Sequence, residues 1–361
     1  MSATPVFLVT GLDAGSMAAA TIGLQFDLPD AVVVRHDLDA AAGHLVRTVS
    51  DLTGLLEREV VPLEHACTSC AVREDVLPTL ERLGAIGRWG AVVAHLPVAA
   101  DALSVCRVLG WDASVAPGVR VAGVVTALDG AAALDDLLGD EILPERRLGT
   151  LDTDRRGVGE VLGAMVEYAD LVAIFGETPE PAVELVRRLA RPGALVTADW
   201  PGLRAEQLLP GLHDHDASEA WVGEVHDGPS RESEGPHAWT LELTSTRPFH
   251  PERLREHADV LGGGPFRSRG CFWLASRPAD VIAWDGAGGQ LSVGVTGSWA
   301  RATPLTRILV TGLREDDARE RLRATFEACL LTEAELAARG PFWDVASDGL
   351  ESWLGPVRRA A

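Results

Sequence analysis

Two cysteines with a spacing suited to metal binding stand in the first third of the chain. Cys67 and Cys70 are separated by two residues, which lets both thiolates bind one soft metal ion such as Zn²⁺. Two sulfur ligands do not complete a tetrahedral site, so further ligands must come from other residues. A redox-active dithiol, or a pair that only packs at the start of an apolar helix, are alternatives for the same pattern.

A glycine-containing turn near the N-terminus is the second candidate site. It follows the apolar run Val6–Val9 and precedes an expected helix, which is the context of a loop that binds phosphate through backbone N–H groups. The candidate nucleotide contacts are Gly11, Ala14, Gly15, Ser16 and Met17. A purely structural turn, which keeps its glycines for close packing, is the alternative.

Composition limits what the protein can bind. The 361 residues include 32 Lys+Arg and 53 Asp+Glu, so the net charge is −21. Like-charge repulsion therefore disfavours direct contact with nucleic acid or anionic membranes, and favours cations and basic protein surfaces. The acidic charge can also serve solubility alone. No stretch approaches the roughly 20 apolar residues of a membrane span, no secretory signal is apparent, and scattered cysteines fit a reducing compartment, so we expect a cytoplasmic protein.

The elements that must position these residues alternate in the first 200 residues. Short apolar strands separated by amphipathic helices predict a parallel α/β sheet. The predicted strands are 5–10, 31–35, 91–95, 119–127 and 171–175, with a sixth at 195–197; the predicted helices are 17–26, 71–83, 99–109, 159–169 and 181–190.

A polar passage separates this region from a second one. We expect a domain over residues 1–210, a polar linker over 211–236, and a smaller α+β domain over 237–361. His213 and His215 begin the linker and are expected to be solvated. The second domain has predicted strands at 239–243, 269–275, 281–284, 291–296 and 306–311, with helices at 251–261 and 316–329.

Three segments of the second domain resemble the C-terminal domain of the CobW-type metal-homeostasis GTPases. Residues 247–254 read R-P-F-H-P-E-R-L, 267–275 read R-S-R-G-C-F-W-L-A, and 327–332 read E-A-C-L-L-T. The corresponding family segments are R-P-F-H-P-x-R-L, R-[AS]-K-G-x-x-W-L-A and D-A-C-L-L-T. From the residues alone, we expect Trp273 to be a core or interface aromatic, and Cys271 and Cys329 to be buried thiols.

The nucleotide motifs of the same family are altered in this chain. Relatives open with a strand followed by T-G-F-L-G-A-G-K-T-T; this sequence has Ser16 in place of the phosphate-binding lysine and Met17 in place of the Mg²⁺-binding hydroxyl. The family's E-T-[TS]-G is replaced by residues 95–98, and its base-reading N-K-x-D by residues 175–178. The resemblance thus implies a P-loop-like fold, whereas the substitutions predict little or no binding of GTP and Mg²⁺ and no hydrolysis.

The cysteine pair resembles the family's metal-binding motif G-C-x-C-C-x-[VL]-R-x-D, with Ser69 in place of its middle cysteine. By alignment with the family's N-E-F-G, His36 stands where a glutamate is associated with metal binding. The resemblance implies zinc at Cys67, Cys70 and His36, with Asp37, Glu64 or His65 as candidates for the fourth position.

Three functions follow as hypotheses. The first is a non-hydrolysing protein of zinc homeostasis or zinc starvation, with a ribosomal or ribosome-hibernation protein as partner, because relatives in high-GC Gram-positive bacteria are associated with zinc starvation and alternative ribosomal proteins. The second is a conventional GTP-dependent metallochaperone that delivers zinc or cobalt. The third is a scaffold that binds neither metal nor nucleotide.

Overall fold

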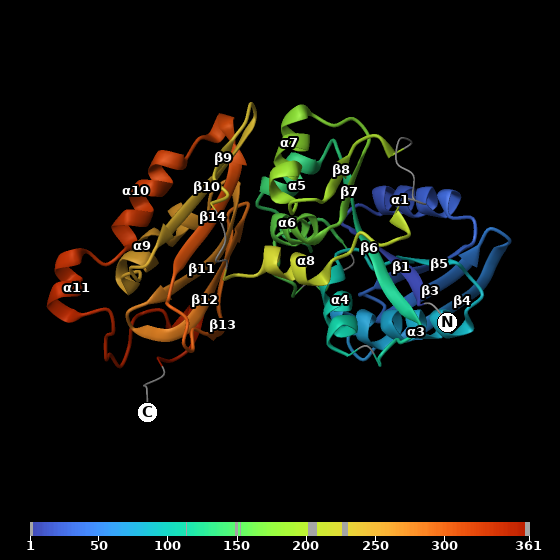
Figure 1. The fold of residues 1–361 in the computed structure, drawn as a ribbon, viewed down its shortest axis with the longest axis horizontal. Helices are drawn as coiled ribbons and strands as arrows, with labels where there is room; N and C mark the ends of the chain where they lie inside the picture. Colours follow the sequence, from blue (N-terminus) through green and yellow to red (C-terminus); the bar gives the residue numbers. More distant parts are fainter. Residues whose placement is uncertain are drawn as a thin grey trace. The chain divides into compact units, whose positions relative to one another are not determined.

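The chain forms two compact units. The computed structural model describes residues 3–112, 114–148, 151, 153–200, 208–225 and 230–357. Unit 1 comprises the residues up to Asp136 together with Glu141–Val222, and unit 2 comprises Leu137–Asp140 together with the residues from Gly223 onward (Figure 1).

Unit 1 is built on an eight-stranded sheet with the order β4-β3-β2-β5-β1-β6-β7-β8. Its strands are β1 (Thr4–Gly11), β2 (Ala31–Asp39), β3 (His44–Asp51), β4 (Gly54–Pro62), β5 (Ala91–His95), β6 (Val119–Asp129), β7 (Leu171–Phe175) and β8 (Leu195–Thr197). Six of them, from β2 to β8 in sheet order, run parallel. This arrangement confirms the predicted parallel α/β sheet.

Helices cover both faces of this sheet because its central strands are apolar on both sides. In β1, Val6 and Leu8 pack on the face covered by α3, while Phe7 and Val9 pack on the face covered by α1. The helical segments are α1 (Ala14–Asp27), α2 (Thr68–Ala71), the π-helix η1 (Val72–Val76), α3 (Leu77–Ile86), α4 (Ala102–Trp111), α5 (Ala133–Leu138), α6 (Val158–Tyr168), α7 (Glu180–Leu189) and α8 (His215–Val222). Among the described helices, none combines the length and hydropathy that a membrane crossing needs.

The hairpin of β3 and β4 is an antiparallel extension that the sequence analysis did not predict. β2 pairs with β3, and β3 with β4, so the hairpin lengthens one edge of the sheet. In β3 the alternation buries Leu45, Arg47 and Val49, but β4 is exposed along most of its length. A strand with so little burial carries only a weak sequence signal.

The segment expected as a linker contains α8, which is fixed to unit 1. Glu219 of α8 pairs with Arg107 at 2.8 Å, and His213 Nδ1 lies 3.0 Å from Asp170 Oδ2. The side chain of His213 is only 5% exposed. The expectation of solvated histidines is therefore wrong for His213, because a buried carboxylate requires a polar partner and the imidazole supplies it.

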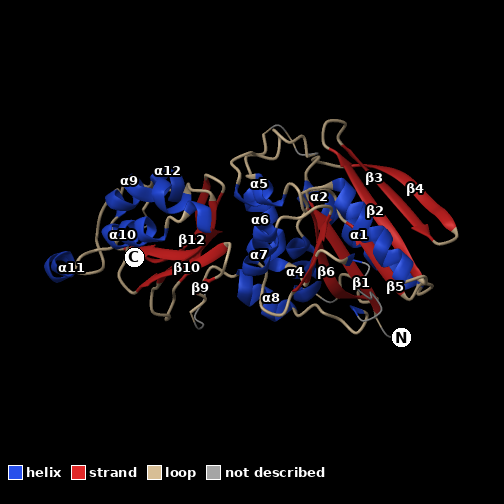
Figure 2. Ribbon diagram, turned by 90° about the horizontal axis from the view of Figure 1, so that it is seen from above, coloured by secondary structure: helices blue, strands red, loops and turns tan. Residues whose placement is uncertain are grey.

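Unit 2 is a six-stranded antiparallel sheet with helices on one face (Figure 2). The sheet order is β13-β12-β11-β14-β10-β9, from β9 (Ser233–Glu234), β10 (Ala238–Ser245), β11 (Phe266–Leu274), β12 (Arg277–Ala287), β13 (Gln290–Ser298) and β14 (Thr306–Leu313). The helical segments are α9 (Pro251–Gly262), the 3₁₀ turn η4 (Arg314–Asp316), α10 (Arg319–Cys329), α11 (Glu333–Arg339) and α12 (Glu351–Leu354). The predicted α+β class is confirmed.

Aromatic side chains fill the core of unit 2. The fully buried members include Trp239, Trp284, Phe249 and Phe272, and Trp273 is also buried. The thiols of Cys271 and Cys329 are buried as expected, and burial raises their pKa values to about 11 and about 12.

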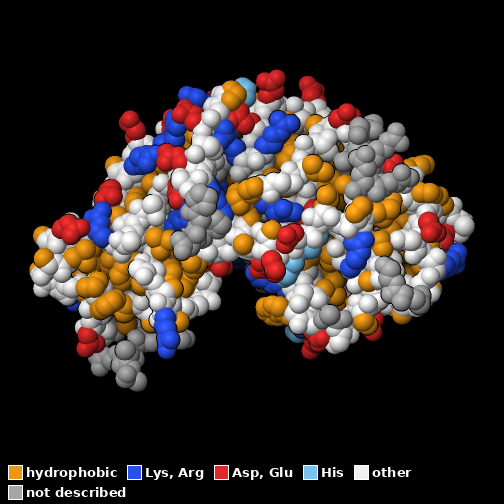
Figure 3. All heavy atoms as spheres, in the orientation of Figure 1, with side chains coloured by type: hydrophobic (Ala, Val, Ile, Leu, Met, Phe, Trp, Pro, Cys, Tyr) orange, Lys and Arg blue, Asp and Glu red, His pale blue; other side chains and the backbone are white. Residues whose placement is uncertain are grey.

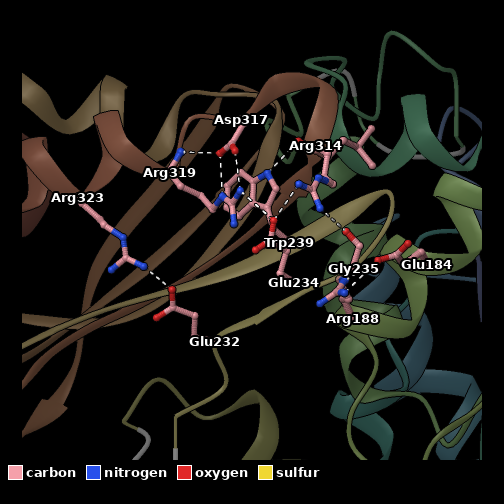
Figure 4. A network of polar contacts seen from close by, with 11 residues as sticks. Glu184, Arg188, Glu232, Glu234, Gly235, Trp239, Arg314, Asp317, Arg319 and Arg323 are labelled. Carbon is pink, nitrogen blue, oxygen red and sulfur yellow. Dashed lines mark hydrogen bonds and ion pairs between the residues drawn. The ribbon is translucent and has the colours of Figure 1, made fainter.

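An arginine network holds the short strand β9 against η4 and α10 (Figure 4). The guanidinium of Arg319 pairs with Asp317 at 2.6 Å and with Glu234 at 3.3 Å, and lies 5.8 Å from the Trp239 ring centre. Arg314 pairs with the same Glu234 at 3.0 Å. Hydrogen bonds from Arg319 are the main reason that the pKa of Asp317 falls to about 2.

The C-terminal segment of unit 2 is tied down by a buried ion pair. Arg277 Nε donates to Asp348 Oδ2 at 2.8 Å, and the two side chains are 2% and 1% exposed. Arg277 also donates to the carbonyl oxygens of Leu354 and Gly355, at 3.1 Å and 2.7 Å. One guanidinium therefore orients both ends of the segment 348–355.

We expect Asp348→Ala to destabilise unit 2 by about 3–5 kcal/mol, because it leaves the Arg277 charge buried without a partner. The hydrogen bonds of Arg277 and Ser276 lower the pKa of Asp348 against the opposing effect of burial. Stabilisation by this pair should therefore be present at neutral pH and be lost as the pH falls through the Asp348 pKa. Urea unfolding followed by tryptophan fluorescence measures the change. Asp344→Ala, at an exposed position, is the control, and equal midpoints for the two variants would contradict the assignment.

Candidate functional site

The candidate site lies at the carboxyl ends of β1, β2 and β5, where open parallel sheets bind their ligands. These three strands are neighbours in the order β2-β5-β1. Their loops bring together the turn at residues 11–17, the end of β2 at His36, and the segment that follows His95. The turn at 11–17 is the connection between β1 and α1, as the sequence predicted.

The carboxylate of Asp13 occupies the N-terminus of α1. Asp13 is the N-cap residue, and its Oδ1 accepts a hydrogen bond from the Ser16 N–H at 2.6 Å. Free N–H groups and the helix dipole make such a position an anion site, which phosphate-binding loops use for their ligand. Here the chain's own side chain supplies the anion.

The two glycines of the turn serve packing in this structure. A Cβ on Gly11 would lie 2.6 Å from the Ala127 carbonyl oxygen, and a Cβ on Gly15 would lie 3.2 Å from Asp13 Oδ1. Gly11 thus allows β1 to approach β6, and Gly15 makes room for the capping carboxylate. Met17, at the position of the metal-binding hydroxyl, is fully buried in the core between α1 and the sheet.

The segment after β5 closes against the same turn. Thr10 Oγ1 donates to the Ala100 carbonyl oxygen at 2.5 Å, and the Ala99 N–H donates to the Gly11 carbonyl oxygen at 3.1 Å. At the end of β5, His95 Nδ1 lies 2.9 Å from Thr21 Oγ1. Burial, and secondarily the charge of Arg35, lowers the pKa of His95 to about 4, so this ring is neutral at pH 7.

An open cavity of about 350 Å³ lies outside the turn. Its charged lining residues are Asp13, Asp37 and Arg147, beside His36 and the apolar residues Leu12, Leu38, Val98 and Leu148. Asp37 is already paired with Arg35 at 2.8 Å, so the Asp13 carboxylate is the lining charge that disfavours a polyphosphate at the start of α1.

Cys67 and Cys70 lie together at the start of α2. Cys67 is its N-cap residue, and the Cys67 sulfur accepts a hydrogen bond from the Cys70 N–H at 3.2 Å. Hydrogen bonding with the Cys67 thiol is the main cause that raises the pKa of Cys70, with burial as the second cause. A thiophilic cation that binds both sulfurs would displace the proton between them. Arg73 Nη2 lies 3.8 Å from the Cys70 sulfur.

His36 is directed to a different partner. Its Nε2 lies 3.2 Å from Asp75 Oδ2, and its Nδ1 lies 3.4 Å from the His95 carbonyl oxygen. Asp75 is buried on the π-helix η1 and also pairs with Arg47 of β3. Although burial opposes ionisation, the contacts with His36 and Arg47 lower the pKa of Asp75. The cluster of His36, Asp75 and Arg47 therefore joins β2, the segment after the cysteines and the hairpin of β3 and β4.

The structure therefore brings some predicted residues together and separates others. Cys67 and Cys70 form a pair, while Glu64 and His65 are exposed just before it. The backbone N–H of Glu64 donates to Glu74 Oε2 at 3.2 Å, and Glu74 also pairs with Arg73. In the part of the chain that the structure describes, no group of three or more His, Cys, Asp or Glu side chains is arranged to hold a metal ion.

Two residues of this site were not singled out from the sequence. Asp13 precedes Ser16 by three residues at a helix start, which is the spacing of a side-chain cap and was a usable signal. Asp75 was recognised only as part of a motif. Its burial beside His36 depends on η1, whose extra residue per turn has no sequence signature, although such turns occur often at functional sites.

The chain is similar in sequence to proteins of metal homeostasis. The family model described as the cobalamin synthesis protein CobW C-terminal domain matches residues 238–330. A zinc chaperone of Mycobacterium tuberculosis is 34% identical over 330 residues, which cover 86% of this chain and 77% of that protein. A zinc-regulated GTPase metalloprotein activator of Dictyostelium discoideum is 22% identical over 346 residues, covering 83% and 70%. Among solved structures, the Zn(II)-bound YjiA GTPase from E. coli aligns with 92% of this chain and 100% of its own, at 15% identity and a TM-score of 0.35.

We expect His95→Gln to reduce the loss of stability that mild acid causes. The imidazole has a pKa near 6.5 when unfolded but about 4 in the folded chain. Between these values the unfolded state binds more protons, so stability falls by up to about 3 kcal/mol as the pH drops from 6.5 to 4. Urea unfolding at pH 7 and pH 5 measures the difference. His44→Gln, at a half-buried position at the start of β3, should keep the wild-type pH dependence, and identical behaviour of the two variants would refute the buried, neutral His95.

Proposed function

Because this chain belongs to the CobW-type family of metal-homeostasis GTPases, we propose that it acts in zinc homeostasis as a member that does not hydrolyse GTP. The names of two relatives, a zinc chaperone and a zinc-regulated GTPase metalloprotein activator, support zinc as the cargo. The geometry at the start of α1 supports the absence of turnover.

The Asp13 carboxylate is the observation that carries the second part of the proposal. It accepts from the Ser16 N–H, a backbone donor that a β-phosphate would need, and it places a negative charge where the ligand's charge would lie. A nucleotide would have to displace this cap from the start of α1. Electrostatic stabilisation of a phosphoryl-transfer transition state requires the opposite arrangement of charges.

The sequence offers no like-for-like replacement for two of the lost side chains. All 32 basic residues are arginine, so these 361 residues contain no lysine that could reach the β- and γ-phosphates. The sequence also contains no asparagine, which removes the first residue of a guanine-reading N-K-x-D. Met17 is buried in the core and has no hydroxyl to offer Mg²⁺.

Cys67 and Cys70 are the residues that we propose to hold zinc as cargo. Two adjacent thiols give soft ligands, and the open coordination positions suit a metal that must be passed on. We further propose that His36 acts on this site through Asp75, because that contact fixes η1 directly after Cys70. Loss of a supporting contact of this kind typically weakens metal binding by about 10–100-fold.

The partner that we propose is a protein with a basic surface, such as a ribosomal or ribosome-hibernation protein. The net charge of −21 supports this choice and disfavours bare RNA. On the face drawn in Figure 3, acidic and basic side chains are interspersed.

The alternative remains a conventional GTP-dependent metallochaperone. The parallel sheet and the cavity at its carboxyl edge favour it. Because it requires turnover, a hydrolysis assay separates the two functions.

The purified protein with Mg²⁺ and GTP should release no phosphate above background. Intrinsic GTPases turn over at about 10⁻³ s⁻¹ or faster, so single-turnover assays with radiolabelled GTP are sensitive enough. A fluorescent GTP analogue should likewise show no saturable binding. Hydrolysis at that rate would instead establish the metallochaperone GTPase.

Cys67→Ala and Cys70→Ala should each abolish stoichiometric zinc, measured by equilibrium dialysis and elemental analysis of the reduced protein. Ser69→Ala, which alters the same helix without removing a thiol, is the matched control and should bind as the wild type does. His36→Ala should weaken zinc binding by about tenfold or more. Zinc retained by both cysteine variants would remove the cysteine pair from the proposal.

A further inference from the structure

A second cavity, of about 370 Å³, lies within unit 2 and is not used by the function proposed above. One wall is the first turn of α9, which belongs to the R-P-F-H-P-E-R-L segment, and the other is the C-terminal segment 343–349. A cavity of this size falls in the range of sites for small ligands or short peptide segments.

The cavity is preformed because both ends of its outer wall are fixed. The Trp343 N–H donates to the Ala275 carbonyl oxygen at 2.7 Å, and Asp348 is held by the buried pair with Arg277. Ser276 also donates to Asp348 at 2.8 Å. Since Arg277 and Ser276 satisfy the carboxylate of Asp348, this carboxylate adds little negative charge to the cavity.

Two guanidinium groups line the cavity without a carboxylate partner. Arg255 extends from the second turn of α9, and Arg339 is the last residue of α11. Within the described residues, neither makes an ion pair, although acidic residues outnumber arginines 53 to 32. Arg339 instead stacks on the Trp343 ring at 4.0 Å, which restricts its mobility and holds its N–H donors at the cavity.

Apolar and hydrogen-bonding groups complete the lining. Trp343, Val345 and Pro251 offer apolar surface, and Glu252 offers an acceptor. The ring of His250 meets Trp343 edge-on at 5.2 Å, and its buried Nδ1 has no hydrogen-bond partner among the described residues. This nitrogen is therefore a polar group in the cavity wall that a ligand or a water could pair with.

We propose that this cavity binds the C-terminal carboxylate of a partner polypeptide whose last residue is apolar, with Arg255 and Arg339 pairing with the carboxylate and Trp343 with the side chain. Planar guanidinium groups match a carboxylate through two parallel hydrogen bonds. Glu252 can accept from a peptide N–H, which a bare inorganic anion lacks. Even a strongly basic protein has a C-terminal carboxylate, so the site is compatible with the acidic charge of this chain.

The test uses the full chain and dye-labelled hexapeptides that end in Leu-Phe. Fluorescence anisotropy should show saturable binding of the peptide with a free carboxylate. The affinity for the same peptide with a C-terminal amide should be lower by about tenfold or more. Arg255→Gln and Arg339→Gln should each weaken the free acid by about tenfold or more, because each removes a charge-assisted hydrogen bond. Trp343→Leu should reduce the preference for an apolar last residue.

Arg321→Gln is the matched control, since it removes the same charge from an exposed position on α10. Thermal unfolding of all variants identifies any that fail to fold, and the comparison of acid with amide needs only the wild type. Equal affinity for acid and amide, no saturable binding, or an unchanged affinity in both arginine variants would overturn the proposal.

Two further results would assign a general anion site and would also overturn it. One is that an amidated peptide carrying a glutamate side chain binds as tightly as the free acid, and the other is full competition by inorganic phosphate. Neither GTP nor zinc enters this assay, so its outcome is independent of the function proposed for unit 1.

Discussion

The negative charge at the N-terminus of α1 is the constraint around which the edge of unit 1 is organised. Asp13 satisfies a helix N–H that would otherwise face solvent or a ligand, and the glycine at position 15 leaves space for its carboxylate. Behind this cap Met17 packs into the core between α1 and the sheet, and at the end of β5 burial keeps His95 neutral.

Buried charge pairs fix the segments that regular secondary structure does not hold. Asp75 joins the segment after the cysteines to β2 and β3, Asp170 holds the approach to α8, and Asp348 ties the C-terminal segment to β12. Each carboxylate is almost fully buried, so removal of its partner would leave an uncompensated charge. These ion pairs fix the position of the segments that they join, and burial of the apolar cores supplies most of the stability.

The two units thus offer different kinds of recognition. Unit 1 has a cysteine pair at the start of a short helix and a carboxyl edge lined with acidic side chains. Unit 2 has a cavity lined by Arg255 and Arg339, and Arg339 stacks on the Trp343 ring.

The sequence by itself determined most of the strands and helices of both cores, because hydrophobic periodicity follows directly from burial on one face. The absence of lysine and asparagine and the proximity of Cys67 to Cys70 can also be read directly from the sequence, because they do not depend on tertiary packing. Tertiary structure decided the rest. The exposed strand β4 has little periodicity, and the burial of Asp75 beside His36 depends on a π-turn. Arg255 of α9 and Arg339 of α11 line one cavity only because distant segments of unit 2 pack together. Such long-range contacts depend on the packing of whole elements, which no short stretch of sequence encodes.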